Sequence, residues 1–254
     1  MLASLKFSRI VFIASVIAAI AYVASYTLWL SGGVTLSIST RAALQLAAER
    51  PGLWGIGFLL QAFAALLWAL VPVAVGQHFR DRAPGLSQLA ILVGSFGFAW
   101  RALADFARAG SMEYLGQLYA TNDPTARAIA EQMAAWAQLW TFGGVWELMG
   151  NGLAFGGFAF LVGLLLVAAR RRNLGWTIAL IGGIAAISLI GTAIYYIAGI
   201  RTALNVISLP GLVALATAPL WLAWLAWMVD QPFNASFDYA RGKQTAPPAR
   251  DAAS

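Results

Sequence analysis

Residues 158–172 read FAFLVGLLLVAARRR, a long apolar run that ends abruptly in three arginines. Such a run is typical of a helix in a lipid bilayer, because a helix needs about 20 apolar residues to cross the hydrocarbon core. The arginines mark the point where the helix leaves the membrane, since Lys and Arg gather on the cytoplasmic side. The stretch therefore predicts a membrane-spanning helix that ends at the cytoplasmic face.

Five further stretches on either side of this one have the same character. Hydrophobic residues make up 61% of the 254 residues and charged residues only 10%, against about 45–50% and about 25% in soluble domains. The runs are about twice the length of the roughly 10-residue segments of a membrane β-barrel. The prediction is an all-α, polytopic membrane helix bundle formed by residues 1–230, with six transmembrane helices over residues 10–30, 53–75, 86–107, 139–168, 174–200 and 209–229.

The distribution of basic residues predicts the orientation of this bundle. With the N-terminus inside, five basic residues face outward, Arg101 lies within a helix, and the larger set is cytoplasmic. That set is Lys6, Arg9, Arg80, Arg82, Arg170, Arg171, Arg172, Arg241, Lys243 and Arg250. Both termini are therefore expected in the cytoplasm, with residues 231–254 as a polar, disordered tail. The excess of arginine over lysine and the abundant alanine indicate a bacterial, inner-membrane protein.

Two outside loops are expected to contain helices. The segment Thr40 to Arg50 mixes apolar and charged residues and precedes Pro51-Gly52, which favours a short surface helix. Asn122-Asp123-Pro124 is a good helix start, because Asp123 can cap free amides and proline suits the first helical position. This helix is expected to continue into the fourth span and to bend at residues 143–144.

The composition excludes several kinds of cofactor and partner. The chain has no cysteine and one histidine, His78, which excludes iron–sulfur clusters, thiolate metal sites and bis-histidine haem. No cofactor is expected. The net charge of +6 is attributed to loops that face anionic lipid, not to nucleic-acid binding. The expected partners are the lipid bilayer and either other membrane subunits or a second copy of the chain.

Charged and polar residues within the spans are the candidate site, because ionisable groups are costly inside a membrane. Arg101 and Asp105 are four residues apart in the third span, and Glu147 and Asn151 have the same spacing in the fourth. Gln61 in the second span lies about 12 Å below its outer end. One interpretation is an outward-facing pocket in which Arg101 binds an anion and a carboxylate handles a proton. The preferred interpretation is an ion-pair network that fastens three helices together.

Two apolar patterns are interpreted as packing. Gly152 and Gly156 have the spacing that permits close approach of helices. Trp221, Trp224 and Trp227 lie three residues apart in the sixth span, where packing against lipid is preferred to stacking on a quinone or pigment.

Four stretches of the second half of the chain form a recognisable order, which are residues 146–152 (WELMGNG), 155–158 (FGGF), 170–176 (RRRNLGW) and the tryptophan- and leucine-rich 210–227. On these stretches, residues 140–229 resemble an uncharacterised family of six-helix bacterial membrane proteins. The family has no established activity, so the resemblance implies a fold and leaves the function open.

The expected function is that of a multi-pass membrane protein without catalytic activity, acting as a structural, assembly or regulatory component through helix contacts. The alternative is a small-solute or proton-coupled transporter that uses the polar cluster. A membrane enzyme ranks last, because no nucleophile, metal set or pair of catalytic carboxylates is recognisable.

Overall fold

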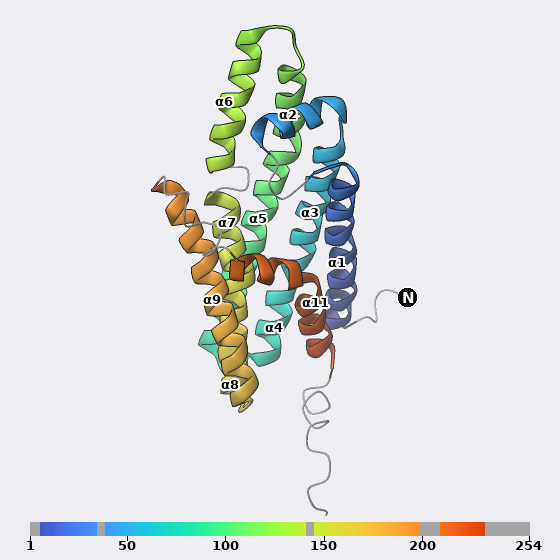
Figure 1. Cartoon of the computed structure of the whole chain (residues 1–254). Helices are drawn as coiled ribbons and strands as arrows, with labels where there is room; N and C mark the ends of the chain where they lie inside the picture. The colour runs from blue at the N-terminus through green and yellow to red at the C-terminus, as the bar shows by residue number, and fades with distance from the viewer. Residues whose placement is uncertain (1–5, 35–38, 141–144, 199–208, 232–254) are drawn as a thin grey trace, which may run out of the picture.

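The computed structural model describes residues 6–34, 39–140, 145–198 and 209–231, and within these it consists of helices without strands. Six helical segments are long and apolar enough to cross a membrane, which confirms the predicted class. They are Phe7–Ser31, Leu53–Phe79, Pro84–Tyr119, Trp146–Ala168, Arg172–Tyr195 and Leu209–Asp230. Figure 1 shows the spans as an elongated bundle. The predicted tail falls almost wholly on residues 232–254, outside the described residues.

The second span is broken into α3 (Leu53–Trp68) and α4 (Leu70–Phe79). Pro72 has no amide hydrogen and therefore interrupts the helical ladder one turn earlier. Ser95 of α5 (Pro84–Tyr119) donates a hydrogen bond of 3.1 Å to the carbonyl oxygen of Ala69, at the break. The neighbouring span thus makes a hydrogen bond to the backbone at the residue between α3 and α4.

The third span, α5, continues far beyond its predicted end at residue 107. It has 36 residues and a length of about 54 Å, well above the roughly 30 Å of the hydrocarbon core. The predicted end was wrong because the apolar pattern reports only where a helix contacts lipid. Residues 108–119 remain helical because they pack against α2 (Thr40–Glu49).

Residues 108–119, α2 and α6 (Pro124–Trp140) form a helical headpiece at one end of the bundle (Figure 1). The predicted short helix is confirmed by α2. The predicted cap is also confirmed, since Asp123 Oδ1 accepts a 2.8 Å hydrogen bond from the amide of Thr125. The headpiece has a small core of its own, made by Leu44, Leu115, Ala130 and Ala134.

The fourth span consists of α7 (Val145–Asn151), a π-helical turn η2 (Gly152–Gly157) and α8 (Phe158–Ala168). Its predicted start at residue 139 was wrong, because residues up to Trp140 belong to α6. The predicted bend at residues 143–144 lies outside the described residues.

Close packing at the glycines of the fourth span is confirmed. A Cβ atom built on Gly156 would lie 2.4 Å from the backbone nitrogen of Ala186, which belongs to α9 (Arg172–Ile197). Gly163 lies equally close to α9, where a Cβ atom would be 2.3 Å from the nitrogen of Ala179. The two spans therefore touch backbone to backbone.

The sixth span, α11 (Leu209–Asp230), contains Pro219. Its first half runs across the neighbouring helices, and its second half runs along them (Figure 1). Because Pro219 has no amide hydrogen, the carbonyl oxygen of Leu215, four residues earlier, loses its helical donor. Tyr22 of α1 (Phe7–Ser31) supplies a replacement, with its hydroxyl 3.3 Å from that oxygen.

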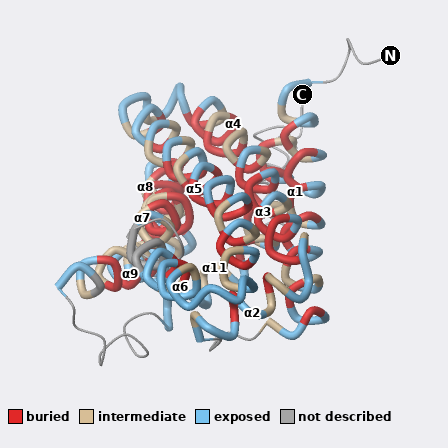
Figure 2. The backbone as a smooth tube through the Cα atoms, turned by 90° about the horizontal axis from the view of Figure 1, so that it is seen from above, coloured by how far each residue is buried: buried red, intermediate tan, exposed pale blue. Residues whose placement is uncertain are grey.

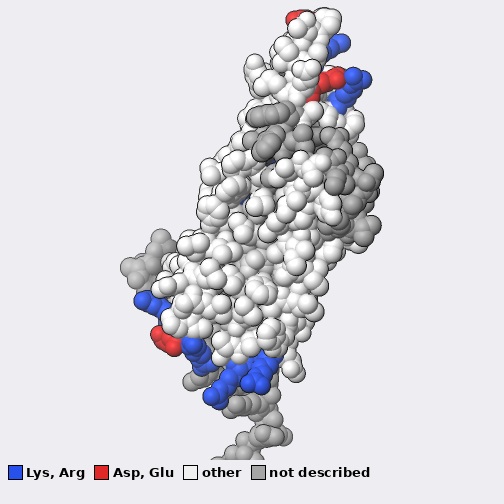
Figure 3. Space-filling model, turned by 90° about the vertical axis from the view of Figure 1, so that its left-hand side faces the viewer, with Lys and Arg blue, Asp and Glu red and all other residues white. Residues whose placement is uncertain are grey.

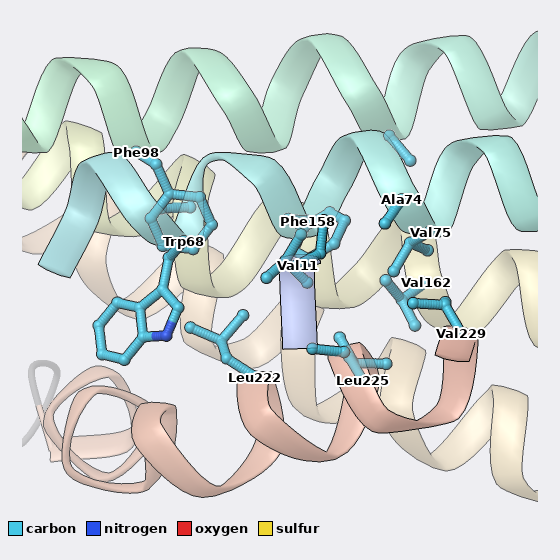
Figure 4. Close-up of a cluster of buried hydrophobic side chains, with 14 of the residues drawn as sticks. Val11, Trp68, Ala74, Val75, Phe98, Phe158, Val162, Leu222, Leu225 and Val229 are labelled. Carbon is cyan, nitrogen blue, oxygen red and sulfur yellow. The ribbon is translucent and has the colours of Figure 1, made fainter. Parts of the chain in front are cut away.

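Buried residues face the middle of the bundle, and the outer faces of the spans are exposed (Figure 2). The main hydrophobic core joins α1, both halves of the second span, α5, the fourth span and α11. Figure 4 shows it extending from Trp68 and Phe98 to Val229, close to the end of α11. Large exposed side chains such as Ile187, at 74%, and Leu220, at 75%, cover the outside. This reversal of the soluble pattern is what a lipid solvent requires.

The end of the bundle opposite the headpiece is basic, and we call it the basic end. Charged side chains gather at the two ends of the face shown in Figure 3, with Lys and Arg dominating the basic end. The turn before α5 supplies Arg80 and Arg82, and the junction between α8 and α9 supplies Arg170 and Arg172, all exposed. Arg9 pairs with Asp230 across 3.0 Å, so the first span begins where the last one ends.

Candidate functional site

Arg101 is the centre of a polar cluster where four spans meet. Its side chain is 1% exposed. Its Nη2 donates a 2.6 Å hydrogen bond to Gln61 Oε1 on α3, and its Nη1 donates to Asn151 Oδ1 on α7. Its Nε lies 3.4 Å from Asp105 Oδ2, one turn along α5. The two terminal nitrogens of the guanidinium therefore each donate one hydrogen bond, whereas Nε has an ion-pair contact with Asp105 but no hydrogen bond within the described residues.

A second arginine continues the cluster toward the headpiece. Arg108 Nη1 lies 3.7 Å from Asp105 Oδ1, and Nη2 forms a close ion pair with Glu147 on α7. The Arg108 guanidinium also lies 5.0 Å from the ring centre of Phe58, within cation–π range. Two arginines and two carboxylates thus alternate, so their formal charges cancel.

The first span joins the cluster through Ser25 and Tyr22. Gln61 Nε2 donates to Ser25 Oγ across 3.2 Å, and Ser25 in turn donates to the Tyr22 carbonyl across 2.7 Å. The Arg101 guanidinium carbon lies 5.6 Å from the ring centre of Tyr22 and 5.5 Å from that of Phe155 on η2. The rings of Tyr22 and Phe155 therefore lie within cation–π distance of the guanidinium, in addition to its hydrogen bonds.

The cluster lies near the headpiece end of the hydrocarbon region. Gln61 and Arg101 are 18 and 17 residues from the basic ends of their spans at Phe79 and Pro84, or about 26 Å along a helix. This is close to the full thickness of the core, roughly 30 Å. An aromatic layer of Trp68, Phe98 and Phe155 closes the cluster on the basic side.

All five residues singled out in the sequence belong to this cluster. Arg101, Asp105, Asn151 and Gln61 are buried, with exposed fractions of 2% or less, so they fill the interior instead of lining an open pocket. The Glu147 side chain, at 18% exposed, is the most accessible member. The arrangement holds four spans in register and has one acidic group within reach of the headpiece side.

Three members escaped the sequence reasoning. Arg108 was assigned to a loop because the third span was ended at residue 107. Its position three residues after Asp105, on the same helical face, was the available signal. Tyr22 and Ser25 lie three residues apart in the first span and carry the same signal, a polar stripe on an otherwise apolar helix.

Asp105 is the member whose bonding is least complete. It is fully buried, and both of its carboxylate oxygens have ion-pair contacts, but within the described part of the chain neither accepts a hydrogen bond of good geometry. No group of three or more His, Asp or Glu side chains that would hold a metal is found among the described residues.

Comparison of the chain with known protein families, with curated proteins and with solved structures finds no match. The resemblance of residues 140–229 to a six-helix membrane family therefore stays a prediction.

Proposed function

We propose that the protein is a non-catalytic, multi-pass membrane component with a structural, assembly or regulatory role, and that the Arg101 cluster is the fastening that holds its spans together. The observation that carries the proposal is the bonding of Arg101. Its hydrogen-bond acceptors come from α3 and α7, its ion-pair partner comes from α5, and rings of α1 and η2 cover it. A guanidinium held on all sides by its own protein is unsuited to binding and releasing an anion.

The apolar interior supports the same proposal. From the aromatic layer to the basic end, the buried residues that join the spans are mainly Val, Leu, Ala, Phe and Met, and the buried serines Ser15 and Ser87 carry no charge. A transporter needs polar groups along a route across the membrane, whereas this core resembles the packing of a static bundle.

The headpiece supports a role in assembly. On α6, Ala130 and Ala134 face the headpiece core, whereas Ile129 is 44% and Met133 is 48% exposed. Small residues inside and large apolar residues outside reverse the usual pattern of a water-exposed helix. Because the headpiece projects beyond the hydrocarbon region, lipid does not account for this surface, and contact with another protein does.

The orientation belongs to the proposal as well. The basic end carries the turns with Arg80, Arg82 and Arg170 to Arg172, which is the signature of a cytoplasmic face. We place both termini in the cytoplasm and the headpiece on the opposite side of a bacterial inner membrane.

The test of the fastening is a set of three variants. Arg101→Met leaves Asp105 buried beside fewer cations, and we expect a loss of about 3–5 kcal/mol in the free energy of unfolding. Arg101→Met/Asp105→Leu removes both charges and should recover most of that loss, because apolar replacement of a buried pair is often neutral. Arg41→Met, at a pair where Arg41 is 75% exposed, is the control and should change little.

Yield and unfolding temperature in detergent give the readout. A stable Arg101→Met protein would contradict the fastening role. Mass spectrometry of intact complexes from native membranes tests the assembly role, since a component of an assembly should be released together with another protein chain.

A proton-coupled carrier is the second candidate, favoured by Asp105. Its buried carboxylate lacks hydrogen bonds, and Arg108 links it to the partly exposed Glu147. Such a row of groups suits proton exchange with the headpiece side. The carrier proposal expects Asp105→Asn to fold normally and to abolish uptake in a solute-uptake assay, whereas the fastening proposal expects any loss to follow the amount of folded protein.

A further inference from the structure

A second feature lies on the lipid-facing side of the bundle, away from the Arg101 cluster. It is a groove of about 260 Å³ between α8, α9 and α11, lined by residues of α11 on both sides of Pro219. Its lining is almost wholly apolar and includes Phe155, Ile181, Ala214, Thr217, Trp221 and Trp224. Gly182 and Ala185 on α9 also line the groove, and at Gly182 α9 packs directly on the fourth span, since a Cβ atom there would lie 2.4 Å from the nitrogen of Phe160.

The groove opens toward the bilayer. On its rim, Ile181 is 59% and Leu220 is 75% exposed, and these residues belong to spans whose outer faces contact hydrocarbon. Its inner wall is Trp221, whose ring centre lies 6.3 Å from those of both Phe155 and Phe158. A hydrocarbon chain can therefore enter from the side and pack against a fixed aromatic wall.

The basic end of the groove leads to the arginine turn. Ile178 lines the groove and is six residues from Arg172, or about 9 Å along α9. Arg170 and Arg172 are exposed in that turn. Trp176, 57% exposed, lies along α9 between Arg172 and Ile178, a depth at which an aromatic ring suits the membrane interface.

This combination of an apolar groove and a cationic turn has the chemistry of a two-part amphiphile. We propose that the groove binds an acyl chain of an anionic phospholipid, whose phosphate is held at the turn formed by residues 170–172. Arginine pairs with phosphate in a fixed, forked geometry. Clusters of basic residues beside transmembrane helices attract anionic headgroups. The distance of about 9 Å between Arg172 and Ile178 separates the phosphate of the lipid from the start of its acyl chain.

The apolar groove and the positive charge of the arginine turn together favour an anionic lipid over other lipophilic occupants. The groove lining has no ionisable side chain, and Thr217 already donates to the backbone oxygen of Val213 across 2.9 Å. A neutral quinone or pigment has no anionic group to pair with the arginine turn. A free anion has no hydrocarbon chain to fill the groove.

The experiment uses the full chain, purified in detergent with equal amounts of phosphatidylglycerol and phosphatidylcholine that carry the same acyl chains. Mass spectrometry of the intact protein counts each lipid retained. Wild type should retain phosphatidylglycerol in preference. Thr217→Phe fills the groove and should lose the retained lipid. Its control is Thr27→Phe on α1, another exposed threonine that bonds only to its own helix, and this variant should keep the lipid.

A second pair of variants tests the headgroup without touching the groove. Arg170→Gln/Arg172→Gln should lower the preference for phosphatidylglycerol roughly 25-fold, since each arginine near an anionic headgroup contributes about fivefold. Arg80→Gln/Arg82→Gln removes equal charge from the other turn and should retain the preference. The four arginines lie on the surface, so these variants should fold normally. They therefore test the proposal even if Thr217→Phe fails to fold.

Three outcomes would overturn the proposal. The first is equal retention of the two lipids by wild type. The second is equal loss in the two threonine variants, and the third is equal loss in the two arginine pairs.

Discussion

The hydroxyl of Tyr22 on α1 lies 3.3 Å from the carbonyl oxygen of Leu215 on α11, so this contact joins the first span to the sixth. That carbonyl is the one that Pro219 deprives of its helical donor, and inside lipid an unsatisfied backbone group is expensive. The Tyr22 ring also lies 5.6 Å from the Arg101 guanidinium. One side chain therefore supports the bend of α11 and covers the centre of the polar cluster.

Tyr22→Phe should lower the free energy of unfolding by about 1 kcal/mol, because the Leu215 carbonyl loses its donor while the ring packing is kept. In a Pro219→Ala background the same change should cost almost nothing, since the amide of residue 219 can then bond to Leu215. The measurement is a double-mutant cycle of thermal unfolding in detergent. Additive effects of the two changes would contradict this account.

Gln61→Leu should cost about 1.5–3 kcal/mol, the range for a hydrogen bond to a charged group. It removes the 2.6 Å acceptor of Arg101 and the link to Ser25. Gln88→Leu, at an exposed position of α5, is the matched control and should leave the unfolding temperature unchanged. Equal behaviour of the two variants would mean that Gln61 contributes no more than a surface glutamine.

Gly156→Ala should destabilise the protein by about 1–3 kcal/mol, the usual cost of overpacking. Its new Cβ atom would meet the Ala186 backbone at 2.4 Å and would push α9 away. Gly110→Ala on α5 is the opposite case. Nothing lies within 4 Å of its Cβ position, so the better helix propensity of alanine should add about 0.5–1 kcal/mol. The unfolding temperature is expected to fall in Gly156→Ala and to rise in Gly110→Ala.

Because the chain has no cysteine, its orientation is testable with single introduced thiols. Gln132→Cys in the headpiece and Asn173→Cys beside the arginine turn are both at exposed positions. A membrane-impermeant maleimide should label Gln132→Cys in intact cells and Asn173→Cys only after the cells are opened. The reverse pattern would place the termini outside.

The class and number of spans were predictable because each span must be apolar over a fixed thickness. The ends of the helices were not, as α5 shows. Its residues 108–119 are polar enough to leave the membrane, yet they stay helical because Leu115 and Gly116 pack against α2. Such contacts between distant segments leave no mark in local hydropathy.

The membership of the polar cluster was predictable in part for a similar reason. Arg101, Asp105, Glu147, Asn151 and Gln61 stand out as polar residues in apolar runs. Their connections did not follow from spacing, because the order in which helices pack decides which side chains meet. Arg108, which pairs with Glu147, became a member only because the helix extends beyond the expected membrane boundary.

The uninterrupted length of α5 has a mechanical consequence. The helix carries Arg101, Asp105 and Arg108 in its middle and the headpiece core residue Leu115 further along, with no proline between them. The helix continues through Gly110 and Ser111 without a break, so one continuous helix connects the headpiece to the charged groups. A partner that tilted the headpiece would therefore also move the three charged groups relative to Gln61 and Glu147. Binding outside the membrane would in this way change the packing inside the bilayer.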